Sequence, residues 1–511
     1  MKKNLITILI FILTACDSLL DVVPENASTF SNYFKNEKEL ESFTTEMHAY
    51  IKSGLTFDNL HVLMGFKADV VKFGEQRVRE LEPLGMLSSP FIDWKRHYDI
   101  IHMGNIILDN ADRVKDIDTE RKNFHLGQAH FAIGIAYFEV VRRWGAAIIT
   151  ENSSSMKPYG NSSVLDILNT AIENGKKAFE LLPYFSDLKD ADGKNLTIKQ
   201  YGCKGSAAAL LSHLYAWKGS IIELYELAEN AHEAYEKSIE WATELISGKT
   251  SKDYHLCHTP EDLCKALSDT KHINPESIFE IMLDRYASQY PTSKVTGISY
   301  ISYPVNKYLN PNSIVNEESA PSFRLQNQTI QNMYAGNDAR RNAYFYKFDE
   351  MAAAPETTGF AYLYKWRNGI YFAAPYLPEQ EEFGTLDADY SYWRLADIHL
   401  LRAECYAKLG KNDKAAIDLN RIRSRANAQT YPAAGETDIK YAVFKEREKE
   451  LICEGHRYYD VVRNQYWKEL GPAFERLSRK DILDGALYLP IPQSAMVNND
   501  LIRQNKYWDK F

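Results

Sequence analysis

Several features that would point to a small secreted domain or a nucleic-acid-binding protein are scarce in this chain. Its 511 residues include only 6 cysteines, and setting aside Cys16, discussed below, leaves an odd number, which argues against a complete disulfide framework. Lysine and arginine total 60 against 69 aspartates and glutamates, a net charge of -9. The basic surface that nucleic-acid binding requires is therefore missing, and we expect no nucleic-acid partner.

Signatures of common enzymes are also missing. The sequence contains no G-x-S-x-G elbow, no H-E-x-x-H helix, no P-loop and no G-x-G-x-x-G loop. Glycoside hydrolases need two carboxylates roughly 5–9.5 Å apart, and no local pattern marks such a pair among the acidic residues. A secreted glycoside hydrolase is the enzymatic interpretation that stays open at this point.

The N-terminus carries a short leader and no later apolar run is long enough to cross a membrane. Two lysines precede the apolar run Leu5–Leu13, and the small residues Thr14 and Ala15 precede Cys16. This order resembles the lipobox of bacterial lipoproteins, which implies removal of residues 1–15 and lipidation of Cys16. Two or more acyl chains would anchor the protein stably. The alternative is an ordinary secretory signal whose cysteine later forms a disulfide.

Apolar residues recur at three- and four-residue intervals over most of the chain, which predicts a mainly α fold. Gly219 and Gly248 are expected to end two of the helices. The predicted helices are Glu39–Ser53, Asp93–Ala111, Phe124–Arg143, Val164–Leu182, Ala207–Lys218, Leu224–Ile246, Arg394–Leu409, Lys414–Arg425 and Ile439–Gly455.

Residues 251–389 differ from the helical parts because proline, glycine, asparagine, serine and tyrosine interrupt any regular period. We expect a loop-rich lobe with short strands at Ser277–Met282 and Tyr362–Trp366. The acidic run Glu379, Glu381 and Glu382 is expected in a solvated loop. The predicted organisation is a signal peptide (1–15), an N-terminal helical part (16–250), this lobe (251–389) and a C-terminal helical hairpin with a docking segment (390–511).

The remaining cysteines suggest two roles. Cys405 and Cys453 lie in apolar helical patterns and are expected in the core. Cys257 and Cys264 are close together, with two histidines nearby. A local disulfide is the stronger interpretation and a metal site the weaker one, since no C-x-x-C pair is present.

The segment Glu446–Arg463, EREKELICEGHRYYDVVR, places opposite charges three and four residues apart on a helix. Exposed pairs of this kind contribute only a few tenths of a kcal/mol each. Arginine can also bind carboxylates or carbonyls through two hydrogen bonds, so we interpret the segment as a network that docks elements onto one another.

The segment also resembles a motif of the SusD/RagB family, and other matches follow in the same order along nearly the whole mature chain. RLADIHLLRAECYAKLG, starting at Arg394, NPESIFEI, starting at Asn274, and the turn Asn337–Arg340 all fit family patterns. So do the closing LYLPIPQSAMVNNDLIRQNKYW and an early helix with Trp94. The helix at 127–145 departs from the pattern, with His130 and Ile133 at positions that are usually arginine.

The resemblance implies a right-handed scaffold of tetratricopeptide-like helical hairpins carrying a loop-rich lobe with a few short strands. It also implies a lipoprotein of the outer membrane that faces the cell exterior in Bacteroidota-like bacteria. Joined to the missing catalytic motifs, it favours a binding protein with no catalytic residues, cofactor or metal. The expected partners are a SusC-like TonB-dependent transporter and an oligosaccharide ligand. Two alternatives are a peptide ligand and an assembly scaffold without any small ligand.

Sugar sites combine aromatic faces with a few hydrogen-bonding groups, and the chain is rich in tyrosine, with 33. Ordinary packing is the alternative for each aromatic residue. The candidates in loops are Arg77, Trp94, Tyr300, Tyr303, Trp366, Arg367, Asn368 and Tyr371.

Overall fold

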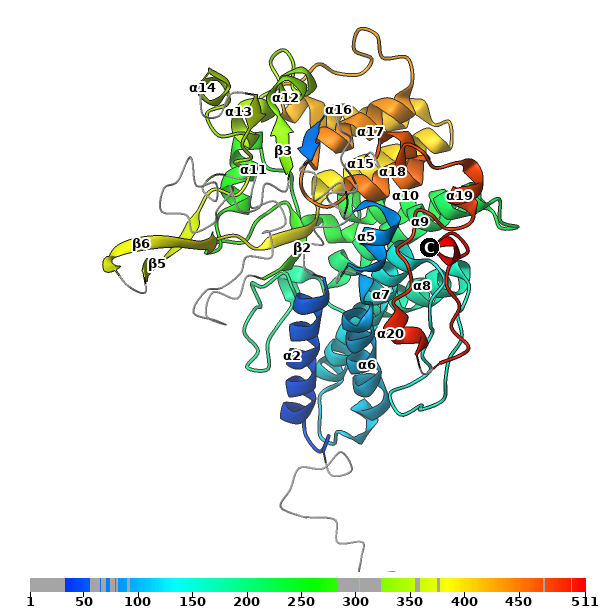
Figure 1. The fold of residues 1–511 in the computed structure, drawn as a ribbon. Helices are drawn as coiled ribbons and strands as arrows, with labels where there is room; N and C mark the ends of the chain where they lie inside the picture. The colour runs from blue at the N-terminus through cyan, green and yellow to red at the C-terminus, as the bar shows by residue number, and fades with distance from the viewer. Residues whose placement is uncertain are drawn as a thin grey trace, which may run out of the picture.

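The computed structural model describes residues 33–55, 65, 70–73, 79, 81–89, 92–282, 303, 323–353, 359–374, 377–471, 474–497 and 499–511. The predicted signal peptide (residues 1–15) and Cys16 lie outside these residues. The protein is mainly helical, as predicted, and Figure 1 shows the helices stacked into one body with the short strands gathered along one side. No helix within the described residues is long and apolar enough to cross a membrane.

The long helices described in the N-terminal part of the scaffold pack consecutively against one another. The longest, α7, lies between α6 and α8 and is buried along most of its length. A Cβ on Gly104 would lie 2.6 Å from Ile133, so α6 and α7 approach closely only because this position is glycine. The helices are α2 (Glu37–Gly54), α6 (Lys95–Asn110), α7 (Thr119–Trp144), α8 (Val164–Leu181), α9 (Lys204–Tyr225) and α10 (Ala231–Ser247).

The prediction that Gly219 ends a helix is wrong. Helix α9 continues through this residue to Tyr225, and a Cβ on Gly219 would lie 2.6 Å from the ring of Tyr235 on α10. The glycine thus allows two helices to touch. The prediction of one helix over Leu224–Ile246 is also wrong at its start. Glu226 adopts the left-handed conformation (φ 52°) and ends α9, and α10 begins after the capping residue Asn230.

The C-terminal helices form a hairpin followed by shorter elements. Gly410, at φ 70°, makes the turn between α15 (Leu395–Lys408) and α16 (Asn412–Arg425), and α15 packs on α10. The single helix expected over Ile439–Gly455 is two: the chain turns at 451–455 between α17 (Ile439–Glu450) and α18 (Arg457–Asn464).

The last residues return to the N-terminal helices. The backbone N–H of Leu489 donates to the carbonyl of Arg143, and the side chain of Asn505 donates to the carbonyl of Trp144 at 3.1 Å. Residues 346 and 361 positions apart are therefore joined at the end of α7. The two short helices here are α19 (Arg479–Leu483) and α20 (Gln493–Met496).

The described residues of the lobe form three small antiparallel sheets. Strand β2 confirms the strand predicted near Ser277, whereas Tyr362–Trp366 forms only an isolated bridge between Leu363 and Phe345. The acidic run lies on strand β6 of a hairpin that projects from the body in Figure 1, so the expected loop is wrong. The strands are β1 (Val71–Phe73), β2 (Ser277–Ile281), β3 (Phe323–Gln326), β4 (Phe360–Ala361), β5 (Gly369–Ala374), β6 (Leu377–Leu386) and β7 (Tyr390–Arg394), paired as β1-β3-β4, β2-β7 and β5-β6.

Short helices complete the lobe and its surroundings. They are α5 (Pro83–Leu87), α11 (Pro260–Leu267), α12 (Asn327–Met333), α13 (Arg340–Tyr344) and α14 (Phe348–Ala353), with 3-10 turns at Ala111–Arg113, Phe185–Asp187, Lys249–Asp253, Trp467–Glu469 and Trp508–Lys510.

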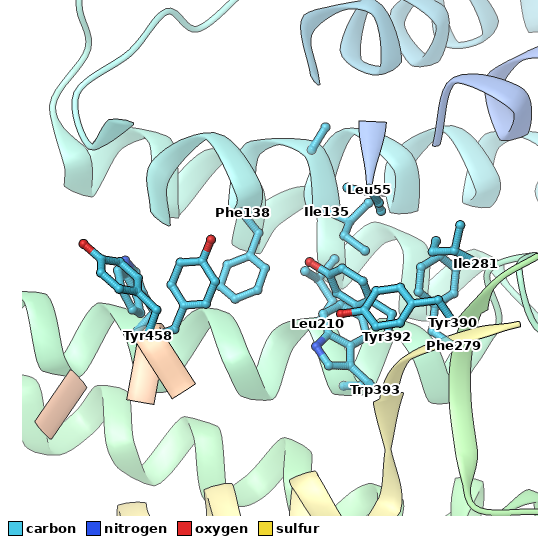
Figure 2. Packing of buried hydrophobic residues seen from close by; sticks show 14 of the residues in the cluster. Leu55, Ile135, Phe138, Leu210, Phe279, Ile281, Tyr390, Tyr392, Trp393 and Tyr458 are labelled. Atoms are coloured by element: carbon cyan, nitrogen blue, oxygen red, sulfur yellow. The ribbon is translucent and has the colours of Figure 1, made fainter. Parts of the chain in front are cut away.

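The β2–β7 pair attaches the lobe to the scaffold. In Figure 2, Trp393 of β7 and Phe279 of β2 lie beside Phe138 of α7 and Leu210 of α9. The Phe279 ring is 5.1 Å from that of Phe131 and 5.9 Å from that of Trp393. These residues belong to one hydrophobic cluster, so the strand pair is packed into the core of the helical scaffold.

Candidate ligand site and the charged core beneath it

Three partly exposed tyrosines of the lobe, one of them a predicted ligand residue, form an aromatic cluster. The rings of Tyr303 and Tyr346 stack with centroids 3.8 Å apart and 9° between their planes. The edge of Tyr364 meets both, at 5.6 and 5.3 Å. All three are half-buried. We call Tyr303, Tyr346 and Tyr364 the tyrosine cluster.

The backbone fixes the position of this cluster. The N–H of Tyr303 donates to the carbonyl of Leu363, and Tyr346 and Tyr362 are joined by a further backbone hydrogen bond. The bridge between Phe345 and Leu363 holds the same two segments together. Tyrosines from three distant parts of the sequence are therefore presented side by side.

Arg367 supports the cluster from behind. Its guanidinium lies 4.6 Å from the centre of the Tyr364 ring and binds both carboxylate oxygens of Glu261, at 2.6 and 2.7 Å. It also donates to the carbonyls of Ala343 and Tyr364. The neighbouring Asn368 donates to the carbonyl of Ser268. The predicted hydrogen-bonding groups are thus engaged within the protein.

The expectation of exposed rings is wrong for two tryptophans. Trp94 is 5% exposed and packs against Tyr98 and Trp144 at the start of α6, and Trp366 is 2% exposed. Neither ring can stack on a ligand, so both leave the candidate site. Tyr371 is 38% exposed on strand β5 and contacts the edge of Phe383, apart from the cluster.

The remaining candidates, Arg77 and Tyr300, lie outside the described residues. Sequence reasoning missed Tyr346 and Tyr364, which complete the cluster with Tyr303. Their only sequence signal is their number among many lobe tyrosines, because the pairing that joins them is not local.

A network of buried charges lies where the lobe meets the C-terminal helices. Arg394, at the end of β7, donates to Glu276, Glu450 and Glu454 at 2.7–2.8 Å. Arg340 binds Asp338 through two hydrogen bonds and also reaches Glu446 at 2.6 Å. We call this set the charged core; it consists of Glu276, Asp338, Arg340, Lys365, Arg394, Arg425, Glu446, Glu450 and Glu454.

A second network continues along α15 and α18. Asp397 accepts hydrogen bonds from Arg447 at 2.7 Å and shares one with His213 at 2.8 Å. Arg463 binds both carboxylate oxygens of Glu404. The docking network expected from the sequence is thus present, although its pairs are buried instead of exposed.

Burial and pairing act on these carboxylates in opposite directions. Burial alone would raise the pKa of Glu404, but Arg463 more than offsets this and lowers the pKa to about 2. The pKa of Glu450 is likewise lowered, since Arg425, Arg394 and Arg340 outweigh the effect of its burial. Glu276, Glu446 and Glu450 are completely buried, so substrate cannot reach them. The motif carboxylates serve to hold the fold together.

The local disulfide considered for Cys257 and Cys264 is not present. Both thiols are free and buried, and burial raises the pKa of each to about 12. Cys264 donates instead to the carbonyl of Ala343. Among the described residues the one trio of potential metal ligands is Glu37, Glu41 and His125, so neither cysteine belongs to a metal site. Arg121 already binds both glutamates of that trio, at 2.6 Å.

Comparison with known proteins decides the family. Residues 182–508 match the model described as the SusD family. The chain belongs to the SusD family. Residues 19–215 match a second model of SusD-like proteins, described as starch-binding and associating with the outer membrane. The sequence resemblance to SusD/RagB is thereby confirmed, and the protein is a SusD-like protein of the glycan-binding, outer-membrane-associated kind.

Individual relatives are distant and match over almost their full length. SusD-like protein P38 of Formosa agariphila is 24% identical over 98% of this chain and 97% of its own. SusD-like protein P25 of the same organism is 23% identical over 89% and 88%.

Solved structures share the fold. A SusD homolog from Bacteroides thetaiotaomicron has a TM-score of 0.75 at 21% identity and covers 93% of this chain and 99% of its own. NanU of B. fragilis has a TM-score of 0.67 at 17% identity, covering 95% and 99%.

Proposed function

We propose that this SusD-family protein captures an oligosaccharide at the outer surface of the outer membrane and delivers it to a SusC-like TonB-dependent transporter for import. The observation that carries the proposal is the partly exposed tyrosine cluster of the lobe, which packs on the helical scaffold through β2 and β7. Family membership supports a binding role. The carboxylates of the charged core are buried in ion pairs with arginine and lysine, so they have a structural role.

The chemistry of the cluster suits a sugar. Sugar rings present C–H faces that pack on aromatic faces, while hydroxyls bind polar groups at the edges. In the stacked pair, Tyr303 and Tyr346 cover one face of each other, and their hydroxyls lie at the ring edges. Arg367 and Glu261 hold Tyr364 in place, so the site needs little reorganisation when a ligand binds.

The proposed anchor gives the protein a limited reach. We propose that Cys16 is lipidated, and 17 residue steps separate it from Tyr33, where the described chain begins. A fully extended segment of that length spans at most roughly 60 Å. Such a tether allows the protein to move while keeping it beside one transporter.

Titration calorimetry of the full chain against a panel of oligosaccharides and peptides tests the ligand. Removing the Tyr346 ring should weaken oligosaccharide binding about tenfold, which corresponds to a stacking contribution of roughly 1.4 kcal/mol. Tyr346→Phe keeps the ring and should bind within about threefold of the wild type. Tyr441→Ala, an exposed tyrosine on α17, is the matched control and should bind normally.

The outcomes separate the alternatives. Tight binding of a peptide with no oligosaccharide binding would replace the glycan by a peptide ligand. If no compound binds while the chain still copurifies with a transporter, the protein is an assembly scaffold.

The anchor and the partner have their own test. Cys16→Ala should release the protein from the outer-membrane fraction of cells that lack the transporter. Retention of that variant in the membrane would contradict the lipid anchor. Failure of the wild-type chain to copurify with any TonB-dependent transporter would contradict delivery.

A further inference from the structure

Two helices of the scaffold bring three potential metal ligands together. Glu37 and Glu41 lie one turn apart on α2, and His125 lies on α7. Because residues four apart share one face of a helix, both carboxylates are presented on the same side of α2. One ligand atom of each residue, a carboxylate oxygen or a ring nitrogen, lies within 4.8 Å of the other two. We call these three residues the α2–α7 triad.

The histidine of the triad is completely buried and directs one ring nitrogen at a glutamate. Nε2 of His125 lies 3.5 Å from Oε2 of Glu41 and has no hydrogen-bond partner among the described residues. The hydroxyl of Thr44 donates to the carbonyl of Leu40, so it accepts from Nδ1–H of His125, at 2.8 Å. Nε2 therefore presents a lone pair to a carboxylate oxygen. A metal ion between these two atoms would remove their repulsion.

The protein holds this ring in the neutral form that binds metals. Burial lowers the pKa of His125 to about 3, and the charge of Arg121 acts in the same direction. Burial raises the pKa of Glu41, and Arg121 opposes that rise. The negative charges of Glu37 and Asp190 add to it. Besides Arg121, the strongest charge effects on Glu41 thus come from carboxylates, which favours a cation at this place.

Arg121 is the counter-ion of both glutamates. Its guanidinium binds Glu37 and Glu41, each at 2.6 Å, and donates to the carbonyl of Lys189. The same side chain lines a surface groove of about 1100 Å³, which Asp190 also lines. The groove gives the guanidinium both space and a carboxylate outside the triad. A divalent cation that takes its place balances the charges of the two glutamates.

The ligand set selects the class of ion. Imidazole suits zinc and other first-row transition metals, whereas magnesium and calcium prefer oxygen ligands. With zinc–ligand bonds of about 2.0–2.1 Å in tetrahedral geometry, two ligand atoms are roughly 3.4 Å apart. Nε2 of His125 and Oε2 of Glu41 have nearly this separation, at 3.5 Å. The geometry therefore fits an ion such as Zn²⁺ with little movement of these two residues.

We propose that the α2–α7 triad binds a divalent transition-metal ion, represented by Zn²⁺, in exchange with the side chain of Arg121. Glu37, Glu41 and His125 supply three ligands, and water completes the coordination. The bound ion joins α2, the first helix that the structure describes, to the longest helix of the scaffold. Since the ion binds the folded chain, it stabilises that chain.

Titration calorimetry of the metal-stripped full chain in detergent with Zn²⁺ tests the site, and thermal unfolding provides a second measurement. The wild type should bind one equivalent, and saturation should raise its unfolding midpoint. Glu37→Gln and Glu41→Gln should each weaken binding at least tenfold and reduce the shift of the midpoint. Glu46→Gln, at an exposed position of the same helix, is the matched control and should bind as the wild type does.

Arg121→Gln tests the exchange, because its expected effect has the opposite sign. The substitution removes the competing guanidinium and should tighten Zn²⁺ binding several-fold. A side chain that only supports the fold would not produce this gain. Mg²⁺ at the same concentrations should leave the unfolding midpoint of the wild type unchanged, since it does not favour the imidazole ligand.

Each contrary result overturns a defined part of the proposal. A wild-type chain that does not bind Zn²⁺ overturns the site. Equal affinity in Glu37→Gln, Glu41→Gln and Glu46→Gln also overturns it, because the ion would then be bound by other residues. Unchanged or weaker binding in Arg121→Gln overturns the exchange. Should Glu41→Gln fail to fold, Glu37→Gln decides, since that side chain is 31% exposed.

Discussion

The charged core joins the lobe to the C-terminal helices, and the tyrosine cluster joins segments within the lobe. The two differ in how their polar groups are used. Every N–H group of Arg394 is directed at a carboxylate or a carbonyl, and the side chain is completely buried. The tyrosines of the cluster are half-exposed and held mainly by ring contacts and backbone bonds. The comparison teaches that the motif residues fix the shape of the protein, while less conspicuous residues are available for a ligand.

The largest effect on stability is expected from acidification, because it protonates many buried groups around the charged core at once. Burial lowers the pKa of His48 and His456 to about 4, so the unfolded chain binds their protons first as pH falls below about 6.5. Arginine pairs outweigh burial and lower the pKa of Glu139 and Glu404 to about 2.

For all four groups the folded pKa is lowered, so their stabilisation is complete above the unfolded pKa and is lost as pH falls through the folded value. The free energy of unfolding should therefore fall between pH 6.5 and 4 through histidines, and from about pH 4.5 towards 2 through carboxylates. Urea titrations at pH 7.5, 5.5 and 3.5 measure this. A constant urea midpoint over that range would contradict the assignment.

The next largest effect is expected from Glu450→Ala. The substitution leaves Arg340, Arg394 and Arg425 with less compensating charge in a buried site, which should lower the free energy of unfolding by about 3–5 kcal/mol. Denaturant unfolding at pH 7 measures the change. Glu236→Ala removes an exposed partner of Lys411 and should cost under about 1 kcal/mol. Similar losses for both variants would show that burial of the network has no special importance.

A smaller effect is expected in the helical scaffold from Gly219→Ala. The added methyl group would meet the Tyr235 ring, and overpacking of this kind costs about 1–3 kcal/mol. Thermal unfolding measures the loss. If the Tyr235 ring is the obstacle, the double variant Gly219→Ala/Tyr235→Leu should recover part of the lost stability. A Gly219→Ala variant as stable as the wild type would refute the close contact.

The smallest change in stability is expected from Tyr346→Ala, because the ring is half-exposed and carries no ion pair. Its free energy of unfolding should change by less than about 1.5 kcal/mol, while ligand affinity falls about tenfold. Parallel unfolding and titration experiments compare the two. A large loss of stability would mean that the cluster is part of the structural framework, as the charged core is.

Sequence periodicity predicted the helices well because each long helix buries one or more apolar faces. It failed at Gly219 and Glu226, where contact with Tyr235 and a left-handed residue decide the helix ends. Strand β6 was not predicted at the acidic run, because Glu381 and Glu382 do not alternate between polar and apolar residues. The strand depends on its pairing with β5.

The site was harder to predict than the fold. Tyr303 was among the candidates, but its partners Tyr346 and Tyr364 are brought to it by pairing between distant segments, which leaves no local pattern. The charges of the Glu446–Arg463 motif were placed correctly as a docking network. Their burial was not predicted, because helical spacing alone does not tell whether the lobe covers them.

The return of the last residues to the end of α7 bears on how the protein folds. Leu489 and Asn505 bond to Arg143 and Trp144, and the backbone N–H of Arg503 donates to Oδ1 of Asn161 at 2.8 Å. Contacts this remote in sequence carry a high loop-closure entropy and slow folding. The bonds that close the end of α7 can therefore form only after the C-terminal segment has been synthesised, long after α7 itself.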